Sequence, residues 1–209
     1  STFSDNTNLD NFDGSAVRYT NGNSGETVSI TDSVFSGNTY TTGGCGAFGL
    51  SASQDVNIQI DNTVFESNVS EFCGGAISVE SGFAFATISL DITNSLFKNN
   101  SASETGDGAK SGGAIYVQNG MNLTLTNNTF FGNSSQVNGG AIQLHNEAGV
   151  IAVEARYNTF YGNSSADGDG NDIYIEAGAG NTSVFENNIF ASGGDECGGD
   201  LSSFTFTNN

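Results

Sequence analysis

The feature that most limits the fold of this 209-residue chain is a repeat of about 30 residues that runs through all of it. A Phe followed three residues later by an Asn recurs along the chain, and successive copies of this Phe lie 30 to 33 residues apart. The pairs are Phe3/Asn6, Phe35/Asn38, Phe65/Asn68, Phe97/Asn100, Phe130/Asn133 and Phe160/Asn163. Phe190 continues the series, with Gly193 in the place of the Asn. Uniform repetition on this scale predicts a solenoid.

A second phrase, Gly-Gly-Ala-Ile, alternates with the first. Its clear copies are Gly74–Ile77, Gly112–Ile115 and Gly139–Ile142, and its looser copies are Gly14–Val17, Gly46–Phe48, Asn171–Ile173 and Gly199–Leu201. Each phrase therefore has seven copies, which predicts about seven rungs.

Apolar and polar residues alternate before each Phe and again after each glycine phrase, as in Val28/Ile30 and Ile77/Val79. A period of two is that of a β-strand, and no segment shows helical periodicity with caps. We therefore predict an all-β, right-handed parallel β-helix with two clear strands in each rung and a short third near the Phe. Residues 1–209 are expected to form a single domain, with both ends falling within a repeat.

The repeated residues are expected to be scaffold. Glycine accepts the positive φ of a sharp corner and lets the next rung approach, while the Phe side chains stack inside the coil. The residue three places before each Phe is expected to form a side-chain ladder from rung to rung. These residues are Asp32, Asn62, Asn94, Asn127, Tyr157 and Asn187.

The charge of the chain excludes several classes of partner. Its formal net charge is −19, with only 4 Lys and Arg residues. Nucleic acid needs a basic surface, so it is not an expected partner. Anionic membranes and acidic polysaccharides are disfavoured for the same reason. No stretch is long and apolar enough to cross a bilayer as a helix.

Together, the Gly-Gly-Ala-Ile and Phe-x-x-Asn phrases resemble the paired motifs of the polymorphic outer membrane protein family, known from chlamydial surface proteins. The resemblance covers the whole chain. It implies an extracellular or cell-surface location and a structural or adhesive role, with glycans or proteins of a host or neighbouring cell as partners. The motifs mainly encode the fold, which does not fix the function.

The chain closes with "SFTFTNN" and opens with "STFSDNT", and the two joined nearly reproduce one internal repeat. Two interpretations follow. The chain is a module of a longer passenger, or it is a filament subunit that stacks head to tail on copies of itself, because open strand edges pair unless they are blocked.

Cys45 and Cys73 each precede a glycine corner in neighbouring rungs, so we predict a disulfide between them, and an oxidising compartment would suit it. The alternative is two small buried thiols. No cofactor is expected to be required. The segment "DGDGND" places oxygen ligands at Asp167, Asp169 and Asn171, which resembles half of a calcium loop, with a solvated acidic corner as the alternative.

Residues predicted to face outward beside the glycine corners form a candidate ligand-binding stripe of Tyr116, Gln143, Tyr174, Glu80 and Gln118. His145 and Glu176 are predicted to be neighbours one rung apart. The alternative function is therefore a carbohydrate-active enzyme, a glycosidase or lyase acting on a neutral polysaccharide, with this pair as acid and base. The simpler interpretation is a solvated face.

Asn-x-Ser/Thr sequons are as frequent as chance predicts, and the predicted fold would leave them accessible for glycosylation. They lie at Asn68, Asn99, Asn122, Asn127, Asn133, Asn163 and Asn181.

Overall fold

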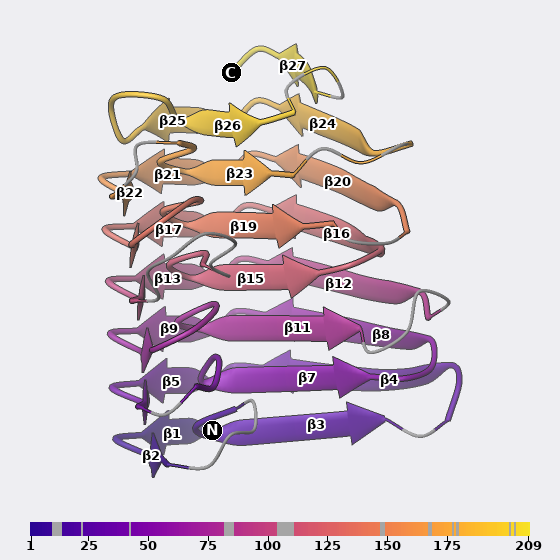
Figure 1. The fold of residues 1–209 in the computed structure, drawn as a ribbon, viewed down its shortest axis with the longest axis vertical. Coiled ribbons are helices and arrows are strands. Elements are labelled where there is room, and N and C mark those ends of the chain that lie inside the picture. The colour runs from indigo at the N-terminus through magenta and orange to yellow at the C-terminus, as the bar shows by residue number, and fades with distance from the viewer. Residues whose placement is uncertain are drawn as a thin grey trace.

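The computed structural model describes residues 1–9, 14–21, 23–41, 43–81, 86–103, 111–146, 149–166, 169–176, 178, 180–200, 202 and 204–209. The chain coils into a stack of turns, with the N-terminus at one end of the stack and the C-terminus at the other (Figure 1). Every strand pairs in parallel with the equivalent strand of the next turn, so the strands form four sheets, named A to D here.

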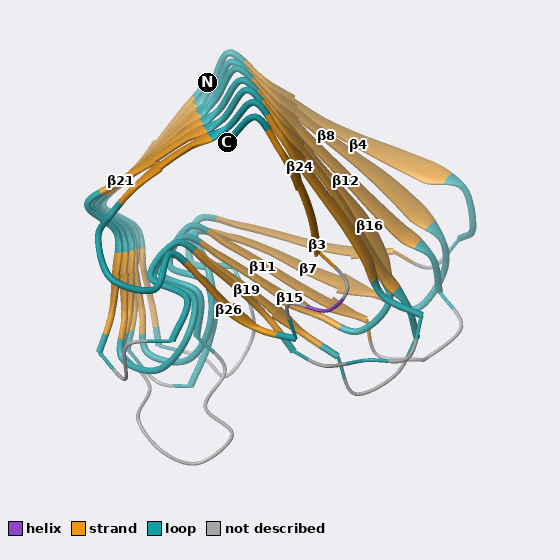
Figure 2. Ribbon diagram, turned by 90° about the horizontal axis from the view of Figure 1, so that it is seen from above, coloured by secondary structure: helices purple, strands orange, loops and turns teal. Residues whose placement is uncertain are grey.

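The four sheets meet at corners around a single interior (Figure 2). Sheet A contains β1 (Thr2–Ser4), β5 (Val34–Ser36), β9 (Val64–Glu66), β13 (Leu96–Lys98), β17 (Thr129–Phe131), β21 (Thr159–Tyr161) and β25 (Ile189–Ala191). Sheet B contains β2 (Thr7–Asn8), β6 (Thr39–Tyr40), β10 (Val69–Ser70), β14 (Ser101–Ala102), β18 (Ser134–Ser135) and β22 (Ser164–Ser165). Sheet C contains β3 (Val17–Asn21), β7 (Phe48–Ala52), β11 (Ile77–Ser81), β15 (Ile115–Gln118), β19 (Ile142–His145), β23 (Ile173–Ile175) and β26 (Cys197–Gly199). Sheet D contains β4 (Glu26–Thr31), β8 (Val56–Asp61), β12 (Ile88–Thr93), β16 (Met121–Thr126), β20 (Ile151–Arg156), β24 (Thr182–Glu186) and β27 (Phe204–Thr207).

The predicted parallel β-helix is confirmed, with three corrections of detail. Each turn except the last holds four strands, because a two-residue strand of sheet B follows each strand of sheet A from β1 to β21. Sheet B has six strands and the other sheets have seven, so the chain makes about six full turns. In the last turn Cys197 pairs with Ile173, so the seventh glycine phrase does not lie at Gly199–Leu201 as predicted. The strand starts earlier because this turn passes from sheet A to sheet C without a sheet B strand.

The interior is filled by the apolar half of each alternating strand. In β12 the inward residues Ile88, Leu90 and Ile92 are fully buried, and the residues between them are half-buried. The Phe of each turn stacks on the Phe of the next, with ring centroids 4.7 to 5.0 Å apart from Phe3 to Phe190. This ladder of rings is the one that the sequence predicts, and it leaves the interior packed rather than hollow.

Buried asparagines form a second ladder along the corner between sheets A and B. The Asn of each Phe-x-x-Asn phrase has an exposed fraction of 2% or less from Asn38 to Asn163. Asn100 donates its backbone N–H and its side-chain amide to Asn133 Oδ1, both at 3.0 Å. Asn133 in turn donates to Asn163 Oδ1 at 2.9 Å. Each side chain thus satisfies backbone and amide groups that the corner would otherwise leave unpaired.

The ladder predicted three residues before each Phe exists only in part. Asn62 donates to Asp32 at 2.7 Å and Asn127 donates to Asn94 at 2.8 Å, but these side chains are exposed. Their backbones have positive φ, between 46° and 58° from Asp32 to Asn187, which Asn and Asp tolerate better than most residues. Their main role is therefore the turn between sheets D and A.

The two glycines of the repeated phrase serve different purposes. The first has a positive φ, as at Gly112 (83°) and Gly139 (63°). The second lies against the next turn: a Cβ on Gly113 would be 2.1 Å from the carbonyl oxygen of Gly140. The corner between sheets B and C is therefore too close to its neighbours for any side chain.

Among the described residues, no helix is long and apolar enough to cross a membrane.

Candidate functional site

The predicted pair of His145 and Glu176 lies at the outward edge of sheet C. His145 ends β19, and Glu176 follows β23 directly. His145 Nδ1 is in direct contact with Glu176 Oε2, and the same carboxylate oxygen accepts the backbone N–H of Asn146 at 3.1 Å. The two side chains are 15% and 38% exposed. The pair therefore ties one turn to the next at the surface.

The rest of the predicted stripe is only partly accessible. The register is as expected, since Ser78, Tyr116, Gln143 and Tyr174 pair in sequence across sheet C. However, Tyr116 is fully buried and Gln143 is 3% exposed, so the prediction that these two contact a ligand is wrong. The Cys45–Cys73 disulfide packs against Tyr116, and Ser111 donates its backbone N–H to Gln143 Oε1 at 2.7 Å.

Cys45 and Cys73 form a disulfide, with their Cα atoms 4.9 Å apart. This is the pair that the sequence predicts. The disulfide packs with Tyr116 in a small core of its own, outside the coil. Glu80 lies beside it, with its Oε1 3.9 Å from Cys73 Sγ. Cys45, Cys73 and Glu80 are close enough together to hold a metal ion, but both sulfurs are used in the disulfide and are not available as thiolates.

Glu80, Gln118 and Tyr174 keep partial exposure on sheet C. Burial raises the pKa of the Tyr174 phenol, and the carboxylates of Asp169 and Glu176 add to the rise. Tyr116 and Gln143 between these three residues are buried, so the five residues of the predicted stripe do not form one continuous exposed surface.

The predicted calcium loop is only partly described. Asp167 lies outside the described residues, so its position cannot be compared with that of Asp169, which is exposed. The Asn171 amide oxygen accepts the backbone N–H of Ser165 at 2.9 Å, and its amide nitrogen donates to the carbonyl oxygen of Gly193 at 2.6 Å. Asn171 thus closes a loop with both ends of its amide, and calcium binding here stays a prediction.

The sequons divide into two groups. Asn99, Asn122 and Asn127 are exposed. The expected accessibility is wrong for the remaining sequons, which are buried: Asn68, Asn133, Asn163 and Asn181. The first three of these belong to the buried asparagine ladder, where the amide nitrogen that would carry a glycan already donates two hydrogen bonds.

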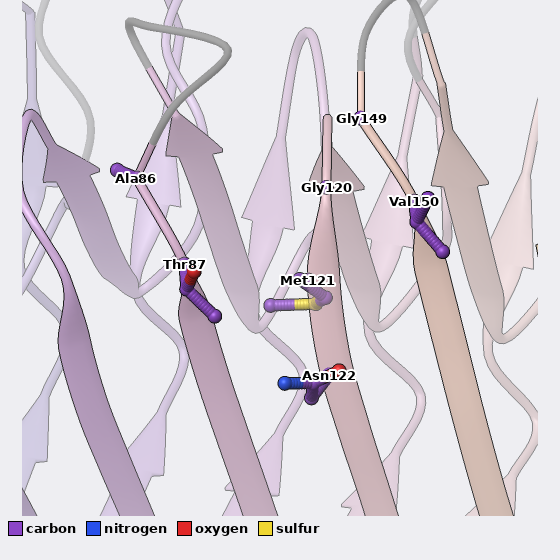
Figure 3. Close-up of a pocket in the computed structure, with 7 residues that line it drawn as sticks. All are labelled: Ala86, Thr87, Gly120, Met121, Asn122, Gly149 and Val150. Atoms are coloured by element: carbon purple, nitrogen blue, oxygen red, sulfur yellow. The ribbon is translucent and has the colours of Figure 1, made fainter.

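A cavity of about 260 Å³ lies between sheets C and D. The connection before β16 is short, whereas the connections before β12 and β20 on either side are longer. Figure 3 shows that the lining residues lie at the starts of three neighbouring strands, β12, β16 and β20. Thr87, Met121 and Val150 are among them. Val150 is 50% exposed at this notch. This cavity is small, and among the described residues that line it no side chain carries a charge.

Sequence reasoning missed an accessible aromatic surface on the outward face of sheet A. Phe131 and Tyr161 occupy equivalent positions in β17 and β21, and their rings stack with centroids 5.6 Å apart and planes 6° from parallel. They are 37% and 55% exposed, and Ile189 on the next strand is 59% exposed. A signal was present, since each of these two aromatics directly follows a ladder Phe and must therefore face outward.

The buried asparagine ladder ends on a carboxylate. Gly193 stands where the next Asn would be, and Asp172 takes over: its Oδ1 accepts from Asn163 Nδ2 at 2.8 Å and from the Ser192 hydroxyl. Its other oxygen, Oδ2, is buried and has no hydrogen-bond partner among the described residues. Burial is the main reason that the pKa of Asp172 rises to about 6, with Glu196 adding to the rise.

Asp172→Asn is expected to stabilise the chain at pH 7.5 by about 2–3 kcal/mol and to have little effect at pH 3, where the carboxyl is protonated in both the folded and the unfolded chain. The folded pKa of about 6 lies above the ordinary value of 3.8. The stabilising contribution of the protonated carboxyl is therefore complete below about pH 3.8 and is lost as pH rises through about 6. Urea unfolding of both proteins at the two pH values measures the effect, and an equal difference at both would contradict it.

Comparison with known proteins adds to this geometry. A sequence profile of the Chlamydia polymorphic membrane protein repeat matches residues 94–118 and 129–144, which include two copies of each phrase. The probable autotransporter YfaL of Escherichia coli (strain K12) is 32% identical over 114 residues, which is 53% of this chain and 9% of YfaL. The chain thus spans less than a tenth of that relative's length. No solved structure matches the chain. The resemblance indicated by the two phrases is confirmed at residues 94–118 and 129–144, which are similar to the polymorphic membrane protein repeat and lie within the parallel β-helix.

Proposed function

We propose that this chain, a β-helix of polymorphic membrane protein-type repeats, is an adhesive segment of a surface-displayed, passenger-type protein. The observation that carries the proposal is the exposed, stacked pair of Phe131 and Tyr161 on adjacent strands of sheet A, with exposed Ile189 on the next strand. Contiguous exposed apolar surface on a soluble fold marks an interaction site. The partners are glycans or proteins of a host or neighbouring cell.

Other features agree with an extracellular role. The net charge of −19 argues against nucleic acid and anionic lipid as ligands. The Cys45–Cys73 disulfide suits an oxidising compartment. YfaL is named as a probable autotransporter, which supports display at a cell surface for a chain similar to part of it.

The geometry favours binding over hydrolysis. A glycosidase holds the sugar bond between two carboxyl groups about 5 to 9.5 Å apart. His145 and Glu176 instead contact each other directly, which leaves no space for a glycosidic bond between them. The neighbouring Tyr116 and Gln143, predicted to hold the saccharide, are buried.

Adhesion is tested with beads coated with the purified chain and incubated with epithelial and bacterial cells. A triple variant carrying Phe131→Ser, Tyr161→Ser and Ile189→Ser is expected to reduce bead attachment by at least about tenfold. The control variant Val69→Ser/Phe72→Ser removes apolar side chains of similar exposure from another face, since both are 37% exposed. Failure of the unaltered chain to attach to any cell would refute the adhesive role.

Head-to-tail stacking is a second candidate function, and a specific observation favours it. At the first turn, a hollow of about 300 Å³ is lined by Phe3, Val17, Ile30 and Phe35. At the last turn Phe206 is 47% exposed. Apolar groups and unpaired strand edges at both ends of the stack are what a second copy would cover. Sedimentation velocity over a wide concentration range tests this, and a monomer at every concentration would refute it.

A further inference from the structure

We propose that Tyr161 is a stacking site for one uncharged pyranose ring of a glycan, an inference that rests on the adhesive role above and names its ligand class. Tyr161 is the last residue of β21 and points outward, because its neighbour Phe160 is fully buried in the interior ladder. The parallel register places Phe131 on one side of Tyr161 and Ala191 on the other.

The two sides of the Tyr161 ring differ in what covers them. One face is covered by the Phe131 ring, stacked at 5.6 Å. On the other side the equivalent residue, Ala191, has only a methyl group. In the interior of the same strands, Phe160 and Phe190 stack at 5.0 Å, so the spacing from β21 to β25 is that of one aromatic ring on another. The small side chain of Ala191 therefore leaves a ring-sized place against Tyr161.

The corner beside this place is open. A Cβ built on Gly162 or on Gly193, which follow the two strands at the corner, would meet nothing within 4 Å. Ile189, two residues before Ala191 and in register with Thr159, is 59% exposed and adds apolar surface to the same strand. The adjacent Thr159 is half-buried and offers a hydroxyl. An aromatic face with nearby apolar surface and a few polar groups is typical of small-molecule recognition.

The charge of the site selects the kind of sugar. The basic residue in this column, Lys98, lies beyond Phe131 and is bound to Glu66 at 2.6 Å. Tyr161 thus has no cation beside it among the residues in register with it, and the chain has a net charge of −19. Uronates and sialylated or sulfated glycans are disfavoured, which leaves neutral hexoses and N-acetylhexosamines.

The test uses saturation-transfer NMR with uncharged oligosaccharides of glucose, mannose, galactose and N-acetylglucosamine. At least one is expected to bind the unaltered chain, and Tyr161→Ala is expected to weaken that binding by about tenfold or more. Ala191→Ile fills the vacant place with a branched aliphatic side chain that covers the free side of Tyr161 and offers no ring of its own, so it should abolish binding. Tyr157→Ala is the matched control, because Tyr157 is 58% exposed but lies outside the stack.

Two results would overturn the proposal: no binding of any of these saccharides, or undiminished binding by Ala191→Ile. The adhesive role is judged separately by bead attachment to cells. Attachment that persists in Tyr161→Ala would leave adhesion in place and refute only the stacking site. A chain that attaches to no cell would refute adhesion, whether or not it binds a free saccharide.

Discussion

Gly113→Ala is expected to destabilise the folded chain by more than about 3 kcal/mol, enough to leave much of it unfolded or insoluble. The added Cβ would lie 2.1 Å from the Gly140 carbonyl oxygen and 2.6 Å from both the backbone nitrogen and the backbone oxygen of Ser134. All three obstructing atoms belong to the backbone of the next turn, so no side chain can move aside. Urea unfolding followed by circular dichroism measures the loss of stability.

The matched control is Gly162→Ala, which isolates the conformational effect of removing a glycine. Gly162 has a φ of +64°, but its Cβ would meet nothing within 4 Å, so we expect a loss of about 1–2 kcal/mol from backbone strain alone. At Gly113 the reverse holds: the added Cβ would clash with the next turn, but the backbone of Gly113 does not have the positive φ that strains other residues. If the two substitutions cost the same, turn-to-turn contact is not the reason for the second glycine of the repeated phrase.

Much of the fold could be predicted, because the period of the apolar residues indicates the strands and the spacing of the two repeated phrases indicates the turns. Most strands of sheets C and D span four to six residues, which is long enough for alternation to show a strand and its inward face. The strands of sheet B have two residues each, such as β14, and two residues cannot show a period. They were therefore missed, although the Asn that precedes each of them repeats with the Phe.

The candidate site was predicted less well, because accessibility depends on packing rather than on register. The neighbouring places of His145 and Glu176 follow from counting residues within each turn, and the structure brings them into contact. The burial of Tyr116 does not follow from counting, since it depends on the packing of Cys45 and Cys73 against its side chain. Sequons inside a repeated structural motif are misleading for the same reason, because the Asn that completes them is part of the interior.

Asn133→Ala is expected to cost about 3–5 kcal/mol, since it removes a side chain that satisfies several buried groups at once. Asn133 Oδ1 accepts two hydrogen bonds from Asn100, from the backbone N–H and from the side-chain amide. Its amide nitrogen donates to the Phe97 carbonyl oxygen at 3.0 Å and to Asn163 Oδ1. Alanine leaves these groups buried without partners. Urea unfolding gives the free energy, and hydrogen exchange of the Asn100 amide reports the local loss.

Asn122→Ala is the control for Asn133→Ala, because both residues are sequon asparagines and Asn122 is exposed on sheet D. We expect this control to change stability by less than about 0.5 kcal/mol. A cooperative ladder also predicts that faster exchange in Asn133→Ala will extend from Asn100 to Asn68, whose backbone N–H donates to Asn100 Oδ1 at 3.1 Å. Faster exchange confined to position 100 would mean that each rung satisfies its own corner independently. Equal stability of the two variants would mean that the buried amides contribute little to holding the turns together.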